Sequence, residues 1–187
     1  MLSEENKKTL LEIARKTIET FIETGKTLPL NNADYSPSLQ AHNGAFVSLH
    51  KKGQLRGCIG RFMPEKPLYE VVRNMSIAAS TRDHRFKPVK AGELDEIELE
   101  ISVLTPPQRI YDPSEIQLGK HGIYIKKNSN SGTLLPQVVI ETGWNLEEFL
   151  GHCSRDKAHI GWDGWRDAEL YTYEALVFKE KDFTGAE

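Results

Sequence analysis

The stretch Leu55-Arg56-Gly57-Cys58-Ile59-Gly60-Arg61-Phe62 combines two arginines, a cysteine and two glycines in one short run. In a β-strand its side chains would alternate between two faces, with Arg56, Cys58 and Gly60 on the same face. Residues two apart on a strand lie about 7 Å apart at their Cα atoms, which lets the Arg56 side chain fold back over the sulfur. A nearby cation favours the thiolate, the form in which cysteine acts as a nucleophile or metal ligand.

The two glycines, Gly57 and Gly60, permit another backbone or a ligand to approach where side chains would block it. The stretch can therefore be built around access to Cys58. In the alternative interpretation the strand is buried, Cys58 is a small core residue, and the glycines mark a bulge. Spacing alone leaves both interpretations open.

The residues around this stretch predict a mainly antiparallel sheet. Runs over 45–50 and 54–59 are strand-like and are separated by Lys51-Lys52-Gly53, which predicts a hairpin with a short turn. Apolar and polar residues alternate over 97–103, and further strands are predicted over 121–126 and 170–178.

Helices are predicted between these strands. Ser3 can cap a helix whose apolar positions recur at helical spacing until Gly25, and a second helix is predicted over 68–79. Shorter helices are predicted up to Gly143 and over 146–150, whereas 26–44 is predicted to be an extended loop. Hairpins with unevenly placed helices indicate an α+β fold with a mainly antiparallel sheet, in one domain that includes a smaller lobe.

Composition excludes several classes of protein. The 187 residues are 39% hydrophobic and 27% charged, which is ordinary for a globular domain. A net charge of −3 argues against a general nucleic-acid-binding surface. The sequence shows neither an apolar signal core at its start nor a run long enough to span a bilayer, so a cytoplasmic protein is predicted. The two cysteines are then expected to be free thiols.

Several blocks of the sequence occur in the order found in one family. They are the stretch at 55–60, Pro67-Leu68, Asp83 with Arg85-Phe86 and Pro88, Ile101-Ser102-Val103-Leu104, His121-Gly122-Ile123, Leu134-Leu135-Pro136-Gln137, and Gly143-Trp144 with Phe149-Leu150. In these blocks the chain resembles the AMMECR-type domain family, also called AmmeMemoRadiSam system protein A, over roughly residues 8–180. His84 departs from the pattern, because relatives often carry a small residue or proline there, so any role for His84 would be particular to this protein.

The resemblance implies an α+β domain of two unequal lobes with a cleft between them. It also implies association with a Memo-like protein, which resembles non-haem-iron dioxygenases, and with a radical-SAM protein. It supplies no settled reaction and no accepted catalytic residue, so it informs the fold more than the function.

Cys58 and Arg56 are the candidate catalytic residues. Cysteine catalysis ordinarily also needs a general base, for which His121 and His84 are the candidates, although His121 is more readily interpreted as a structural histidine. Asp83 can line the cleft with Arg85 or can simply cap a turn and pair with it. The candidate ligand-binding residues are accordingly Gly57, Gly60, Asp83, Arg85 and His121.

Other kinds of site have weaker support. The adjacent His152 and Cys153 do not form a ligand set of the zinc type, so no metal site is predicted. No phosphate-binding loop or dinucleotide fingerprint is present, and no cofactor is expected. A small anionic ligand remains open, because guanidinium groups suit carboxylates and phosphates. The candidates for holding it are Arg56, Arg61 and Arg85.

Three tryptophans offer a surface for partners. Trp144, Trp162 and Trp165 can anchor a protein interface if exposed, or they can fold back and seal the core. Two hypotheses therefore remain. The protein is either a binding module that acts with Memo-like and radical-SAM partners, or a small cysteine-dependent enzyme or redox-responsive thiol protein that acts on an anionic molecule through Cys58.

Overall fold

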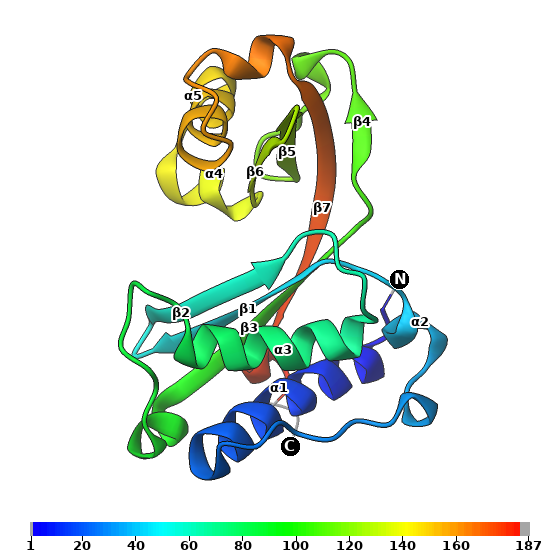
Figure 1. Ribbon diagram of the computed structural model, residues 1–187, viewed down its shortest axis with the longest axis vertical. Coiled ribbons are helices and arrows are strands. Elements are labelled where there is room, and N and C mark those ends of the chain that lie inside the picture. The colour runs from blue at the N-terminus through cyan, green and yellow to red at the C-terminus, as the bar shows by residue number, and fades with distance from the viewer. Residues whose placement is uncertain (1, 184–187) are drawn as a thin grey trace. The chain divides into compact units, whose positions relative to one another are not determined.

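The computed structural model describes residues 2–183, which divide into two compact units (Figure 1). The first unit contains the chain up to Val103 and again from Leu176, and the second contains Leu104–Ala175. Helices accompany antiparallel strands in both units, so the predicted α+β class is confirmed. The cleft between lobes that the resemblance implies stays a prediction.

The first unit is built on the predicted hairpin. Strands β1 (Ala45–Lys51) and β2 (Gln54–Arg61) pair antiparallel, and β1 also pairs with β3 (Ile97–Leu104). The turn between β1 and β2 consists of Lys52 and Gly53, both with positive φ, which matches the twist of a two-residue hairpin. The last part of β7 (Glu169–Lys179) follows β3, so the order is β2-β1-β3-β7 and β2 is an edge strand.

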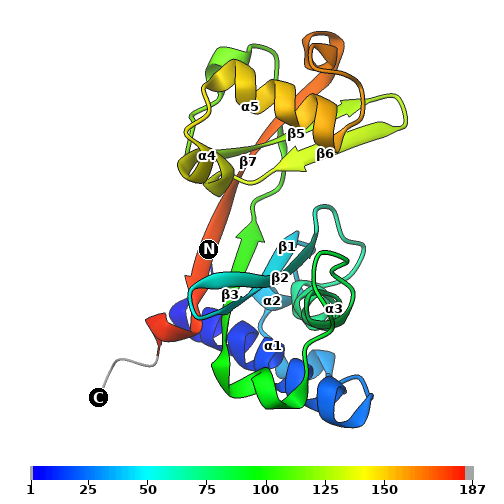
Figure 2. The same cartoon turned by 90° about the vertical axis from the view of Figure 1, so that its left-hand side faces the viewer.

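Two helices cover one face of this sheet (Figures 1 and 2). Helix α1 (Glu4–Thr24) has Ser3 as its N-cap and Gly25 as its left-handed C-cap, as the sequence predicts. Helix α3 (Leu68–Thr81) lies against β1 and β2. The apolar faces of the two helices pack against alternate residues of β1 and β3. The core that they form includes Leu10, Ile18, Val47, Leu49, Leu68, Val72, Leu99 and Ile101.

The segment predicted to be an extended loop over 26–44 is partly helical. It contains a 3₁₀ turn, Asn32–Asp34, and a short helix α2 (Pro37–Gln40), whose Leu39 is buried. A further 3₁₀ segment, η2 (Ala91–Glu96), comes directly before β3. Such short turns have no apolar periodicity, which is why the pattern misses them.

The second unit has its own sheet in the order β4-β7-β5-β6. The predicted strands correspond to β5 (His121–Lys127) and β7, with β6 (Asn130–Leu134) completing a hairpin, whereas β4 (Gln108–Ile110) was not predicted. Helices α4 (Gln137–Thr142) and α5 (Leu146–His152) begin and end near the predicted positions. The remaining turns are Pro113–Glu115, the π-helical Cys153–Lys157, Gly164–Asp167 and, in the first unit, Glu180–Asp182.

All three tryptophans pack against other residues of the second unit. Trp165 is buried in its core, which confirms the sealing interpretation for that residue. Trp144 is half-buried and stacks on His152 with ring centroids 3.9 Å apart. Trp162 lies edge-on to His152 and occupies the space over Gly151.

Candidate functional site

A β-bulge in β2 decides where Arg56 and Cys58 point. Leu49 of β1 is opposite Gly57 and His50 is opposite Leu55, which leaves Arg56 without a partner in the ladder. A bulge interrupts the strict alternation of faces. The alternation that led us to expect Arg56 and Cys58 on one face is therefore interrupted between them, and the alternative interpretation of a bulge is supported at Gly57.

The Arg56 guanidinium binds groups of its own unit instead of the sulfur. Its Nε donates to Glu93 Oε1 at 3.2 Å, its Nη2 donates to Glu93 Oε2 at 3.0 Å, and its Nη1 donates to the Lys87 carbonyl at 2.9 Å. The hydrogen bonds that Glu93 accepts from Arg56, from the Lys90 N–H and from Lys51 hold the pKa of its carboxyl well below its usual range, at about 2. Arg56 thus ties β2 to η2 and to the segment before it.

Cys58 is half-buried, and its sulfur accepts a hydrogen bond from a hydroxyl. Ser48 lies opposite on β1 and its Oγ donates to Cys58 Sγ at 3.1 Å. Burial raises the pKa of the Cys58 thiol, while the Ser48 hydrogen bond and the charge of Arg85 act in the lowering direction. The net direction is upward, so the neutral thiol is favoured over the thiolate.

Asp83 and Arg85 hold the backbone of Cys58. Asp83 Oδ2 accepts the Cys58 N–H at 2.9 Å, and Arg85 Nη2 donates to the Cys58 carbonyl at 3.2 Å. The two side chains also pair with each other, because Arg85 Nη2 and Nε reach the Asp83 carboxylate at 2.7 and 2.9 Å. Asp83 is 5% exposed, and these contacts hold the pKa of its carboxyl well below its usual range.

This pair replaces the missing neighbour of an edge strand. The N–H and C=O of Cys58 point away from β1, where no further strand lies in the described chain, and a carboxylate and a guanidinium satisfy them. Asp83 therefore does pair with Arg85, as one of the two interpretations holds. Both residues also contact Cys58, and no local pattern in the sequence predicts that contact.

The space over both glycines of the stretch is filled with protein atoms. A Cβ on Gly57 would lie far inside van der Waals distance of the Ala79 carbonyl in α3, and one on Gly60 would meet the Phe46 ring. Another backbone approaches at Gly57, which was one of the two alternatives. At Gly60 the neighbour is an aromatic side chain, so at neither position is the space of the absent side chain open to a ligand.

The two candidate histidines, His121 and His84, lie in different units, and a third histidine lies on β1. His121 lies in the second unit, where its Nδ1 accepts the N–H of Gln117 at 3.2 Å, a local contact that fits the structural interpretation. His84 is exposed. His50 was not among the candidate bases, yet it follows Ser48 by two residues on β1 and so shares the face of Cys58.

His50 also has an unusual environment. Its Nε2 is buried and has no hydrogen-bond partner among the described residues. The strand alternation over 45–50 was a usable signal for placing His50 beside Ser48, and the register of the hairpin then places both opposite the stretch.

Two general features of the described chain bear on the type of site. Among residues 2–183, no three side chains of the His, Cys, Asp and Glu types gather closely enough to hold a metal ion. No helix in that range has the length and apolar character needed to cross a membrane.

Comparison with known proteins places the whole chain in one family. The family model described as AMMECR1 matches residues 11–178. A protein from Methanosarcina mazei is 37% identical over 193 residues, covering 99% of this chain and 96% of its own length. A protein from Methanopyrus kandleri is 41% identical, covering 94% of this chain and 89% of its own.

A solved structure agrees with this match. The crystal structure of the uncharacterized protein PH0010 from Pyrococcus horikoshii resembles this chain with a TM-score of 0.88 at 37% identity, covering 96% of this chain and 94% of that one. Since the family model spans most of the sequence and the relatives align over nearly their full lengths, the protein belongs to the AMMECR1 family.

Proposed function

We propose that this protein is a binding module that acts with Memo-like and radical-SAM proteins, and that the stretch around Cys58 shapes its surface rather than performing catalysis. The partners follow from the family resemblance. The choice of binding over catalysis follows from the contacts of the stretch itself.

The observation that carries the proposal is that the reactive side chains of the stretch are already engaged. Arg56 is held by Glu93, and Asp83 and Arg85 are held by each other and by the Cys58 backbone. Cysteine catalysis needs a thiol, a general base and groups that bind the electrophile, and all of these must be free to contact a substrate. Here the charged groups stabilise an edge strand, and burial keeps Cys58 a neutral thiol.

One observation favours a second candidate function, cysteine-dependent chemistry. His50, Ser48 and Cys58 share one face of the β1–β2 hairpin, and His50 has a ring nitrogen without a partner in the described chain. Residues diagonally opposed on neighbouring strands lie within reach of long side chains. A rotation of His50 toward the sulfur would supply the missing base, and the thiol would then act on a small molecule.

Retrieval of partners tests the proposed function. A tagged form of the protein, expressed in cells that contain both partner classes, is expected to co-purify with a Memo-like or a radical-SAM protein. Cys58→Ser is expected to retrieve the same partners undiminished, because a hydroxyl can still accept the hydrogen bond of Ser48. Mass spectrometry of the eluate gives the readout.

Two outcomes would count against this account. Absence of both partner classes from the eluate would contradict the binding module. If Cys58→Ser binds the partners normally but fails to complement a deletion of the gene, the cysteine-dependent function would be supported instead. His50→Gln should then fail to complement as well.

A further inference from the structure

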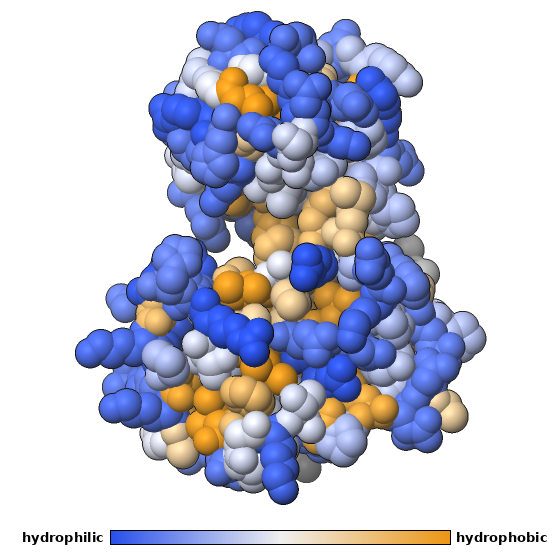
Figure 3. Space-filling view, viewed as in Figure 1, coloured by the Kyte–Doolittle hydropathy of each residue, from blue (hydrophilic) through white to orange (hydrophobic). Residues whose placement is uncertain are grey.

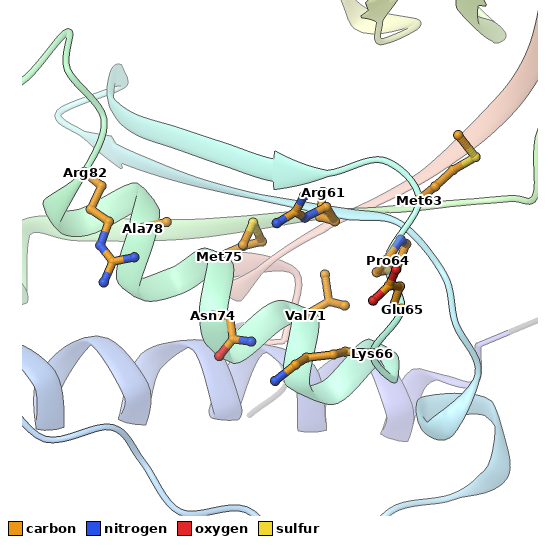
Figure 4. Close-up of a pocket in the computed structure, with 10 residues that line it drawn as sticks. All are labelled: Arg61, Met63, Pro64, Glu65, Lys66, Val71, Asn74, Met75, Ala78 and Arg82. Atoms are coloured by element: carbon orange, nitrogen blue, oxygen red, sulfur yellow. The ribbon is translucent and has the colours of Figure 1, made fainter. Parts of the chain in front are cut away.

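A groove of about 520 Å³ lies in the first unit beside the end of β2 (Figure 4). One side consists of a stripe of α3, Val71, Asn74, Met75 and Ala78, together with the C-cap residue Arg82, and Arg61 with the segment 63–66 forms the other. Helical spacing places these α3 residues on one face. The groove is therefore a continuous surface with an apolar floor, and orange patches break the hydrophilic surface of this unit in Figure 3.

Two guanidinium groups that line the groove form no ion pair within the described residues. Arg61 and Arg82 are exposed, and within residues 2–183 neither has a carboxylate partner. Lys66, which also lines the groove, pairs with Glu70 at 3.2 Å. Figure 4 shows the Met75 side chain between Arg82 and Arg61. The lining has three basic residues and one acidic residue, Glu65, in a chain whose net charge is −3, so the groove attracts anions against the overall charge.

The backbone beside the groove is also free to pair. The Cys58 N–H and C=O point to the outer edge of β2, and the ladder continues without a shift from Cys58 to Gly60. The N–H and C=O of Gly60 must therefore point to the same edge, which no strand of the described chain covers. An added extended segment can use this pair of groups.

The dimensions fit such a segment. From Val71 to Arg82 the helix rises about 16 Å at 1.5 Å per residue, which equals about five residues of an extended chain. Arg82 directly precedes Asp83, which binds Cys58, so Arg82 lies near Cys58 and roughly 10 Å along the strand from Arg61. In an extended peptide, side chains four residues apart lie about 13 Å apart on one face, within reach of two long arginine side chains.

We propose that this groove binds an extended acidic segment of a partner protein, with two carboxylates four residues apart on Arg61 and Arg82 and an apolar side chain between them on Met75. The inference rests on the proposed function, because it assigns the docking surface of the binding module. The Asp83–Arg85 pair at Cys58 limits the added strand to the end of β2, so side chains contribute more to binding than the backbone does.

A titration with a synthetic peptide tests the groove directly. The probe is an eight-residue fluorescent peptide with glutamate, leucine and glutamate at alternate positions and threonine elsewhere, followed by fluorescence polarisation. The protein is expected to bind it, with affinity that falls as salt rises. Replacing both glutamates by glutamine, or introducing Arg61→Gln with Arg82→Gln, is expected to weaken binding about tenfold or more.

The matched control removes two arginines elsewhere. Arg109→Gln with Arg155→Gln changes the net charge equally at exposed sites outside the groove and is expected to leave binding unchanged. Unchanged binding in the groove double variant would overturn the inference, as would equal binding of the glutamine peptide. Glutarate that competes at the peptide's own concentration would also overturn it, because a free dicarboxylate would then be the ligand.

This test separates the inference from the proposed function. If the peptide binds but neither Memo-like nor radical-SAM proteins are retrieved, the proposed partners are contradicted and the peptide-binding role of the groove stands. If the Arg61→Gln, Arg82→Gln variant retrieves these partners at wild-type levels, the groove is not their docking surface, and the proposed partners stand. Both glutamine substitutions are at exposed side chains without ion pairs, so the fold is expected to tolerate them.

Discussion

Gly57→Ala is expected to destabilise the protein by about 3 kcal/mol, since the new methyl group must displace a helix backbone. The atom it meets is the carbonyl of Ala79, within α3, and α3 packs against both α1 and the sheet. A carbonyl inside a helix cannot rotate away as a side chain can. Urea unfolding monitored by circular dichroism gives the free energy of unfolding.

Gly60→Ala is the matched control for this prediction. Its Cβ would meet the ring of Phe46, which is only half-buried and can turn aside, so a loss of about 1 kcal/mol is expected. Equal losses at the two positions would mean that α3 yields as easily as a single ring. The close approach of helix and strand would then not explain the glycine at position 57.

Asp83→Asn is expected to lower the free energy of unfolding by about 2 kcal/mol at neutral pH, because charge-assisted hydrogen bonds to Arg85 and to the Cys58 N–H are lost. Arg85 is half-exposed, which keeps the loss below that of a fully buried pair. Unfolding by urea at a series of pH values measures both the loss and its pH dependence.

The pH dependence follows from the lowered pKa of Asp83. In the unfolded chain this carboxyl titrates near 3.9, and in the folded protein it titrates lower. Its contribution is therefore complete above about pH 5 and is lost as pH falls below about 4. The difference between wild type and Asp83→Asn should shrink in that acidic window, and a difference independent of pH would contradict the assignment.

Asp156→Asn serves as a control for this carboxylate. Asp156 also has a lowered pKa, because of hydrogen bonds with Arg155 and His152, but its side chain is exposed. Solvent screens such surface pairs, so a much smaller effect is expected than at Asp83.

The regular elements of this fold could be predicted, because each rests on a local pattern. Helix α1 has a cap at each end and one apolar face, and apolar and polar residues alternate along β3 from Ile97 to Val103. The hairpin of β1 and β2 follows from its glycine turn. The bulge at Arg56 could not be located, since a bulge depends on the register between two strands and not on either strand alone.

In the candidate site, too, only contacts between residues close in the sequence could be predicted. Pairing of Asp83 with Arg85 is a contact between residues two apart and was one of two interpretations. Their hydrogen bonds to the Cys58 backbone join residues 25 and 27 positions apart and form only because the end of α3 lies beside β2. Arg56 was assigned to the sulfur because Glu93, 37 positions away, could not be recognised as its partner.

The most direct test of the account is the pH dependence of alkylation of Cys58 in the folded protein, followed by peptide mass spectrometry. Cys153 provides the internal reference, because it is fully buried and burial raises its pKa to about 12. Because burial raises the pKa of the Cys58 thiol, its alkylation rate is expected to reach its midpoint above the ordinary thiol value of about 8.5. A midpoint well below that value would reveal an activated thiolate and would contradict the assignment of this strand to structure and binding.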